Sequence, residues 1–340
     1  MIKIKPFIVL GVILFAITLL IPSILVLPFM EAKISGKLGE NVQEADNSKK
    51  TSEPAVEVAV YREEKKTIEQ LDLDEYVLGV VASEMPADFK PEALKAQALT
   101  ARTYIVKKME NGGSIDLPDG AVVGDSIKYQ VYKNRNELKK IWKASDYNWK
   151  IRKIEEAVAA TSGKILTYDG QPIDATFFST SNGYTENSSA IWSNDIPYLT
   201  SVESPWDTKS PKYEGKEVLS VPAFEQKLGV NLTNSQEVGQ IIERTAGKRV
   251  AKVKINGKVL TGIEIREKLN LKSTDFEWVR KGDSIIITTQ GYGHGVGMSQ
   301  YGANGMALEG KTYKDIVKHY YKGVQVTDAN KLLTKYTAKK

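Results

Sequence analysis

The chain contains no cysteine and only two histidines, His294 and His319, among its 340 residues. Without cysteine, an exported domain has no disulfide bonds and no thiolate metal ligands. Two histidines also argue against a histidine-based zinc site. A calcium or magnesium site built from carboxylates stays open, although no stretch resembles an EF-hand loop. The absences therefore exclude disulfide-stapled and thiolate-metal proteins.

The charge balance is only mildly basic, with a formal net charge of +5 and a sequence pI of about 8.9. Such an excess is typical of a solvated surface, and outside a cell it favours an anionic surface such as a cell wall. No stretch resembles a nucleic-acid-binding motif, so we expect no nucleic-acid partner.

One long stretch, residues 7–30, lacks charge altogether and is dominated by Ile, Leu, Val and Phe. An apolar run of this length predicts a single transmembrane helix. Lys3 and Lys5 precede it, so residues 1–6 should be cytoplasmic and the rest of the chain extracytoplasmic. The alternative is a cleaved signal peptide, but the run is longer than a signal core and residues 29–33 make a poor cleavage site.

The remaining chain divides by composition. Residues 31–54 are polar and lack aromatic side chains, which predicts a flexible linker. Residues 55–328 can form one large exported domain, and residues 329–340 read as a basic tail. Predicted helices and strands do not alternate strictly, which favours an α+β fold with mostly antiparallel hairpins over a doubly wound sheet.

Periodicity and turn residues predict the elements of this domain. An edge strand is expected at 56–61, and Asp72 with Glu75 suggests a capping box that opens a helix ending near Met85. Two hairpins are expected, one pairing 164–168 with 175–178 and one pairing 249–255 with 258–260 around Asn256-Gly257. More strand is expected within 276–289. Further helices are predicted at 91–109, 149–162, 262–269, 299–308 and 313–321.

The most informative stretch is the glycine-rich run from Gly291 to Gly302, which contains His294. It joins a predicted strand to a predicted helix, where glycine usually permits a tight turn or a close approach. The spacing differs from a dinucleotide-binding motif, and no acidic residue follows at the required distance, so we discount that reading. His294 is then either a site residue or a structural histidine.

Three residues on the first two helices of the domain are candidates for chemistry. Glu84 stands at a helix C-terminus, which disfavours a carboxylate, and apolar neighbours would raise its pKa as a general acid requires. An exposed glutamate at a frayed helix end is the alternative. Gln97 and Arg102 follow on the next helix, and Arg102 is read either as a partly buried arginine with a fixed partner or as a solvated one.

The segment 179–186 is dense in hydroxyl and amide groups, including Ser181, Asn182 and Tyr184. Such groups suit recognition of sugar hydroxyls, although an ordinary surface loop is the alternative. A nucleophilic serine with His294 as its base is a weaker hypothesis, because the chain has no Gly-x-Ser-x-Gly elbow.

Four blocks together resemble the stage II sporulation protein D family. They are LDEYVLGVVASEMP at 73–86, LKAQALTARTY at 94–104, FSTSNGYTE at 178–186 and GYGHGVGMSQYGA at 291–303. The blocks lie in order across nearly the whole exported domain, and a membrane anchor also fits this family.

The resemblance implies a lytic transglycosylase that cleaves peptidoglycan glycan strands at the septum during engulfment of the forespore. It also implies a partner, the amidase–endopeptidase stage II sporulation protein P, which first removes stem peptides. The family's catalytic glutamate falls on Glu84. Some members bind zinc through cysteine and histidine, but this chain lacks those cysteines, so we expect no metal and no cofactor.

One carboxyl group can suffice for this reaction, because the sugar's own C6 hydroxyl replaces water as the nucleophile. Other residues must hold the strand and stabilise the positive charge that develops on the sugar. Candidates for these substrate-binding roles are Gln97, Arg102, Ser181, Asn182, Tyr184, His294, Gln300 and Tyr301.

Two other functions remain open at this stage. One is a non-catalytic glycan-binding scaffold that recruits and stimulates a partner amidase, and the other is a tethered structural protein without glycan affinity. Cleavage of glycan strands separates the first reading from both alternatives, and sedimentation with purified wall separates the two alternatives.

Overall fold

The computed structural model of the chain describes residues 56–192, 194–232 and 237–336. These residues all belong to one compact unit. The predicted cytoplasmic residues 1–6, the anchor 7–30 and the linker 31–54 lie outside these residues. Within the described part of the chain, no helix is long and apolar enough to span a bilayer.

Buried apolar side chains form two clusters within this unit. The larger core draws on residues 58–202 and 296–333, which come from both ends of the described chain. The smaller core lies within residues 221–287. Helices pack with mostly antiparallel sheets in both, which confirms the predicted α+β class.

The elements around the larger core come from two separated stretches of the chain. They are β1 (Glu57–Arg62), β2 (Thr67–Asp72), α2 (Leu73–Glu84), α3 (Pro91–Glu110), β3 (Val123–Gly124), α4 (Arg135–Ile141), α5 (Ala144–Ala160), β4 (Lys164–Tyr168), β5 (Gln171–Pro172), β6 (Phe177–Phe178), β13 (Met298–Ser299), α8 (Gln300–Leu308), α9 (Tyr313–Tyr320), β14 (Gln325–Asp328) and α10 (Asn330–Leu333).

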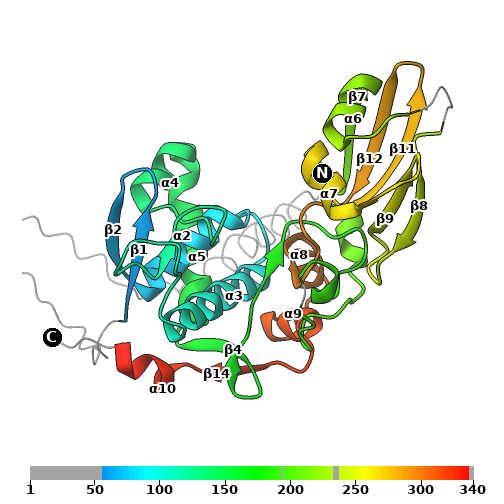
Figure 1. Cartoon of the computed structure of the whole chain (residues 1–340). Coiled ribbons are helices and arrows are strands. Elements are labelled where there is room, and N and C mark those ends of the chain that lie inside the picture. Colours follow the sequence, from blue (N-terminus) through cyan, green and yellow to red (C-terminus); the bar gives the residue numbers. More distant parts are fainter. Residues whose placement is uncertain (1–55, 193, 233–236, 337–340) are drawn as a thin grey trace, which may run out of the picture. The chain divides into compact units, whose positions relative to one another are not determined.

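The smaller core is built from one continuous stretch. Its elements are β7 (Glu214–Ser220), α6 (Val221–Leu228), β8 (Gln240–Arg244), β9 (Val250–Ile255), β10 (Lys258–Thr261), α7 (Gly262–Leu269), β11 (Asp275–Lys281) and β12 (Ser284–Gln290). The strands form two antiparallel sheets, in the orders β10-β9-β8 and β11-β12-β7. Figure 1 shows β11 and β12 side by side, with β7 next to β12.

Helix α3 is the centre of the larger core. It begins at Pro91, which suits the first helical position because its missing N–H would be unpaired there anyway. Alanines 93, 96, 98 and 101 are fully buried, and these small side chains let α2, α5, α8 and α9 pack closely on it. The predicted helix at 91–109 is thus confirmed, as is its end before Gly112 and Gly113, whose φ angles are 78° and 90°.

The N-terminal strands differ from prediction in two respects. Strand β1 is central, because β2 pairs with it on one side and β3 on the other, so the predicted edge position is wrong. Asp72 does cap α2 by accepting from the N–H groups of Asp74 and Glu75. The side chain of Glu75, however, pairs with Arg135 at 2.7 Å, so it does not complete the predicted capping box.

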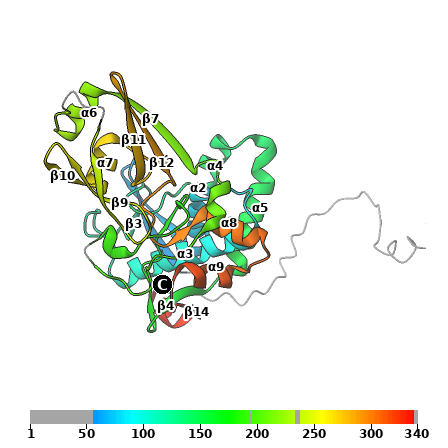
Figure 2. The same ribbon diagram turned by 90° about the vertical axis from the view of Figure 1, so that its right-hand side faces the viewer.

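The predicted pairing of 164–168 with 175–178 is also wrong. Strand β4 instead pairs with β5 and β14, and β6 pairs in parallel with β13. Figure 2 shows β4 and β14 together beneath α3. The predicted turn at Asp169-Gly170 does form, between β4 and the short β5, but the distant β14 supplies the longer antiparallel pairing. This change brings β6 beside the glycine-rich run.

Other elements agree closely with prediction. The hairpin of β9 and β10 turns at Asn256-Gly257, where both φ angles are positive. Helices α7, α8 and α9 lie at their predicted positions, whereas α5 begins five residues before the predicted start at Trp149.

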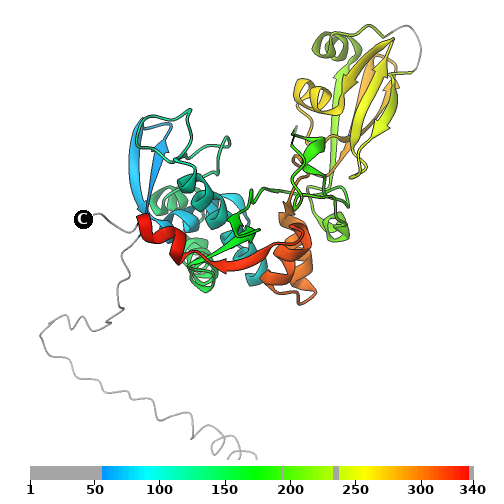
Figure 3. The same cartoon turned by 60° about the horizontal axis from the view of Figure 1, so that its bottom comes forward.

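Part of the predicted tail, residues 329–336, packs against the larger core. Leu333 is buried, and the Tyr336 hydroxyl donates to the carbonyl of Met109 at 2.8 Å. Figure 3 shows the red segment of β14 and α10 that leads to this contact.

Candidate active site

Glu84 is the last residue of α2, and the end of the helix and two hydrogen bonds fix its position. Met85 follows in an extended conformation, so the helix stops there before Pro86. The side-chain amide of Gln300, at the start of α8, donates to the Glu84 carbonyl at 3.0 Å. The carboxyl Oε1 accepts from the backbone N–H of Val131 at 2.8 Å, and Oε2 has no hydrogen-bond partner among the described residues. One carboxyl oxygen is therefore anchored while the other is available.

The Glu84 carboxyl lines a cavity of about 300 Å³. Its walls come from the ends of α2 and α3, the loop before α4, the segment around β6 and the glycine-rich run. The lining residues are Glu84, Tyr104, Ile127, Tyr129, Gln130, Val131, Ala175, Thr176, Phe177 and His294. Glu84 is the only acidic residue among them, so any carboxyl chemistry in this cavity belongs to it.

Burial raises the pKa of Glu84 above its ordinary value, and the hydrogen bond from Val131 opposes this shift with a smaller effect. The direction agrees with the prediction made from its place at a helix end. A raised pKa keeps more of the carboxyl protonated near neutral pH, which is the state that a general acid needs.

His294 faces the same cavity as a neutral ring with both nitrogens engaged. Nδ1 accepts from the backbone N–H of Val296 at 3.1 Å, so Nε2 carries the proton and donates to the carbonyl of Phe177 at 3.1 Å. Burial, with a further contribution from Arg266, lowers the pKa of His294 to about 4. The ring therefore shapes the wall, and neither nitrogen is free to serve as the base for a serine.

The glycine-rich run holds His294 in place by close backbone approach. Gly293 has a φ of 118°, and a Cβ there would lie 2.8 Å from the Cβ of Phe178. Gly297 has a φ of 82° and lies against the Thr176 carbonyl, where a Cβ would collide with it. Only glycine permits both the backbone angles and these contacts, so the run seats β13 against β6.

Gln97 and Gln300 lie behind Glu84. Gln97 is fully buried on α3, and its Oε1 lies 3.5 Å from the Nε2 of Gln300. Since Gln300 also donates to the Glu84 carbonyl, the two amides connect α3, α8 and the end of α2. The structure thus brings three predicted residues together, but neither glutamine lines the cavity.

Tyr301 lies outside the cavity on a partly exposed surface. Its ring packs edge-on against Phe89 with centroids 4.9 Å apart, and the Lys212 ammonium lies 6.0 Å from the ring centre. An aromatic ring beside a cation suits contact with the face of a sugar. Tyr301 is not, however, among the residues that line the Glu84 cavity.

Arg102 is placed elsewhere, as a buried tie between three helices. Its Nη2 donates to Asp74 at 2.8 Å, and its Nη1 donates to the carbonyl of Thr161 at 2.8 Å. The side chain is fully buried, so the reading of a partly buried arginine with a fixed partner holds and the solvated one does not. These contacts are with other groups of the protein, and Arg102 does not line the Glu84 cavity. Its role is therefore structural.

Ser181, Asn182 and Tyr184 also lie outside the Glu84 cavity. Ser181 donates to the buried carboxylate of Asp207 at 2.8 Å. Asn182 donates to Asp275 at 2.8 Å and so links the loop after β6 to the elements of the smaller core. The Tyr184 ring lies 3.9 Å from the Lys248 ammonium.

Sequence reasoning missed several residues of the cavity wall. Tyr104 ends one of the four blocks and offered a signal, but Ile127, Tyr129 and Val131 lie in a loop without motif or periodicity. Ile127 is 90% exposed, and an exposed isoleucine beside a cavity is the kind of signal that only the structure reveals.

Comparison with known proteins gives consistent matches. The family model "Stage II sporulation protein" matches residues 61–168. The chain is 55% identical to stage II sporulation protein D of Bacillus subtilis (strain 168) over 335 residues, which cover 96% of this chain and 97% of that protein. It is 54% identical to stage II sporulation protein D of Bacillus amyloliquefaciens over 344 residues, covering 99% of this chain and all of the relative.

A more distant relative shares only part of its length. The amidase enhancer of Bacillus subtilis (strain 168) is 30% identical over 307 residues, which cover 73% of this chain and 40% of the enhancer. The two full-length matches and the family model agree with the four sequence blocks around Glu84 and the glycine-rich run. The chain therefore belongs to the stage II sporulation protein D family.

Proposed function

We propose that this protein is a membrane-anchored lytic transglycosylase that cleaves peptidoglycan glycan strands during sporulation. The observation that carries the proposal is Glu84: a carboxyl with a raised pKa, anchored through one oxygen, in a cavity lined by no other acid. We further propose that its preferred substrate is a strand stripped of stem peptides.

The chemistry needs one carboxyl in two successive roles. The protonated Glu84 first donates its proton to the glycosidic oxygen, and the bond from C1 to that oxygen breaks. The Glu84 carboxylate then accepts the proton of the C6 hydroxyl as O6 bonds to C1, which closes a 1,6-anhydro ring. The proton returns to Glu84 at the end, so the reaction needs no second carboxyl group and consumes no water. Both sugar products are uncharged at the cleaved bond.

The rest of the cavity supports these steps by orientation. The N–H of Val131 holds Oε1, which leaves Oε2 to exchange the proton. Neutral His294 contributes no positive charge that would oppose an oxocarbenium-like state. Tyr104 and Tyr129 also line the cavity, and the Tyr129 hydroxyl is held by Asp116 at 2.7 Å.

The cellular setting belongs to the same proposal. We place the protein in the cell membrane at the sporulation septum, with its N-terminus cytoplasmic and the domain that carries Glu84 outside. Its partner is the amidase–endopeptidase stage II sporulation protein P, which supplies denuded strands for engulfment. Fluorescent fusions at each terminus, with protease protection, test the orientation.

Glycan strands freed of stem peptides provide the direct test of the reaction. The full-length chain should release products with 1,6-anhydro ends, detected by mass spectrometry. Glu84→Gln keeps the size of the side chain but cannot donate and accept the proton in this way, so it should cleave about 10²- to 10⁴-fold more slowly. Equal cleavage by both proteins would keep the enzyme and remove Glu84 from its centre.

A second function has its own support, the 30% identity to an amidase enhancer. On this reading the protein binds glycan and stimulates an amidase without cleaving the strand. Glu84→Gln would then stimulate the amidase as fully as the unmodified chain, and neither would yield anhydro ends.

A further inference from the structure

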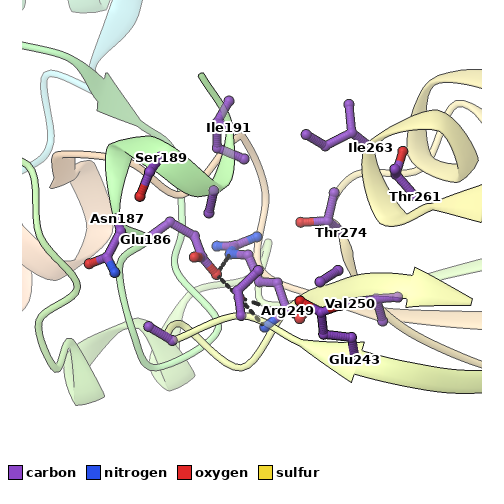
Figure 4. A pocket seen from close by; sticks show the side chains of 14 residues that line it. Glu186, Asn187, Ser189, Ile191, Glu243, Arg249, Val250, Thr261, Ile263 and Thr274 are labelled. Carbon is purple, nitrogen blue, oxygen red and sulfur yellow. Dashed lines mark hydrogen bonds and ion pairs between the residues drawn. The ribbon is translucent and has the colours of Figure 1, made fainter. Parts of the chain in front are cut away.

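A second cavity, of about 310 Å³, lies between the loop after β6 and the elements of the smaller core. Figure 4 shows the side chains that line it. Glu186, Asn187 and Ile191 come from the loop, whereas Arg249 and Ile263 come from the smaller-core side. We call it the Glu186–Arg249 pocket. The four sequence blocks touch it only at Glu186, so the proposed cleavage reaction leaves it without a role.

An under-satisfied ion pair lines this pocket. Glu186 is 0% exposed and Arg249 is 1% exposed, and the Arg249 Nε lies 3.7 Å from the Glu186 Oε1. Nη1 of the arginine donates to Ser273, and the Thr245 hydroxyl donates to Oε1 of the glutamate. Among the described residues, Nε and Nη2 of Arg249 and Oε2 of Glu186 have no hydrogen-bond partner.

Unpartnered polar atoms at this depth are costly, so they point to a group that completes them. Burial raises the pKa of Glu186 and lowers that of Arg249, in agreement with a pair that is short of partners. The two N–H groups share one edge of the guanidinium and need an acceptor. The free carboxylate oxygen needs a donor.

The pocket shares a wall with the Glu84 cavity. Gly295 packs directly against the Arg249 guanidinium, since a Cβ there would lie 2.7 Å from Nε. The N–H of Glu186 donates to the Gly295 carbonyl at 2.8 Å. The preceding residue, His294, lines the Glu84 cavity, and its ring lies 5.8 Å from that of Trp192, next to Ile191. The two cavities therefore adjoin through residues 294 and 295.

A secondary amide meets these requirements. Its carbonyl accepts from Arg249, its N–H donates to Glu186, and its methyl group packs on Ile191 and Ile263. A ligand carboxylate would pair with Arg249 but would be repelled by the negative charge of Glu186. Because the Glu186–Arg249 pair is already neutral overall, it does not call for an added anion. The chemistry therefore selects a neutral acetamido group over an anion.

We propose that the Glu186–Arg249 pocket is a second glycan subsite that binds the acetamido group of a sugar beyond those at Glu84. The inference rests on the proposed glycan substrate, but not on its cleavage. The unpartnered atoms are shielded from solvent, so binding requires a small outward shift of the turn at Ser189 and Ala190, which forms the outer wall.

Two neutral pentasaccharides separate acetamido recognition from general sugar binding. The β-1,4-linked pentamer of N-acetylglucosamine carries acetamido groups, and the β-1,4-linked pentamer of glucose lacks them. Calorimetry with full-length Glu84→Gln, in which turnover is blocked, should show the acetylated pentamer binding at least about tenfold more tightly.

Ala190→Trp in this background fills the pocket from its partly exposed wall without removing a buried charge. It should abolish most of the preference for the acetylated pentamer and leave the affinity for the glucose pentamer unchanged. Ala159→Trp, on the exposed face of α5, is the matched control and should leave both affinities unchanged. Equal melting temperatures show that both variants are folded.

The outcomes distinguish this inference from the proposed function. If Ala190→Trp binds the acetylated pentamer as its parent does, the subsite is wrong while a glycan substrate stands. If the parent binds neither pentamer, both proposals fail. If Ala190→Trp weakens only oligosaccharides that carry a muramic-acid carboxylate, the pocket binds an anion and the acetamido assignment is overturned.

Discussion

Individual side chains in this protein acquire their properties from what surrounds them. Glu84 is partly buried and Glu186 is fully buried, and both have raised pKa values, yet they occupy different settings. Glu84 stands at the edge of a cavity beside one backbone N–H, whereas Glu186 faces Arg249. Arg249 favours the ionised form of Glu186, whereas burial raises the pKa of Glu84 against a single backbone hydrogen bond, and this difference makes Glu84 the candidate acid.

The pH dependence of cleavage follows from the raised pKa of Glu84. The proposed first step needs the protonated carboxyl, so kcat/KM should be greatest below the pKa and fall as pH rises through it. Because burial raises that pKa, the fall should lie above the ordinary value of 4.5. A pH profile of anhydro-product formation measures it, and a descending limb at or below 4.5 would contradict the assignment.

Arg102 provides a test between structural and substrate-binding roles. Arg102→Met removes the pairing with Asp74 and leaves the buried Thr161 carbonyl without its donor. We expect the free energy of unfolding to fall by about 3 kcal/mol, measured in urea, with KM for glycan strands unchanged. A raised KM at unchanged stability would show instead that Arg102 binds substrate. Lys95→Met, which removes a partly exposed pair within α3, is the control and should cost under about 1 kcal/mol.

At the scale of elements, the Glu84 cavity is formed mainly by the ends of helices and strands and by the segments that connect them. Helix α2 contributes its last residue, Glu84, and the glycine-rich run contributes His294, while the first residue of α8, Gln300, donates to the Glu84 carbonyl from behind. Each belongs to an element that the larger core holds rigidly. The functional groups therefore lie where regular structure stops and side chains face the cavity rather than the core.

The glycine-rich run should tolerate no side chain at Gly293. Gly293→Ala places a Cβ against Phe178 as well as forcing an unfavourable φ of 118°, so it should shift His294 and lower kcat along with stability. Gly170→Ala is the matched control, because its φ is also positive at 76° but nothing lies within 4 Å. The control should cost only about 1–2 kcal/mol from backbone strain and keep kcat.

If both alanine variants lose the same stability and both keep kcat, the close packing of this run on β6 does not position the cavity. Thermal unfolding and cleavage rates, measured on the same samples, decide the point.

At the scale of the whole molecule, two hydrophobic cores are joined by polar contacts. The segment that carries the smaller core is inserted between two parts of the larger one. Asn182 with Asp275 and Glu186 with Arg249 connect them. Polar connections cost less to open than an apolar core, so we expect this junction to be the softer part.

Asn182→Ala tests the junction. It removes the donors to Asp275 and to the Gly247 carbonyl, and it should lower stability by about 1–3 kcal/mol. Hydrogen exchange should increase at residues 244–249 and remain unchanged in α3. A large loss of glycan cleavage without any change in exchange would show that Asn182 contacts the substrate directly.

The sequence by itself determined the local elements and the family. Asp72 and Pro91 marked the starts of α2 and α3, and Asn256-Gly257 marked a hairpin, because caps and turns depend on residues close together in the chain. The four blocks identified the family because short motifs keep their spacing. The direction of the Glu84 pKa shift could also be predicted, since the helix end and its apolar neighbours are local.

Only the tertiary structure decided which residues meet. The pairing of β6 with β13 and of β4 with β14 joins segments more than a hundred residues apart, and no turn signal reports such pairing. The same long-range packing placed Ser181, Asn182 and Arg102 in buried protein contacts, brought Val131 to Glu84 and set Arg249 beside Glu186. A side chain's polarity says that it needs a partner, whereas the packing of distant elements decides whether that partner is protein or ligand.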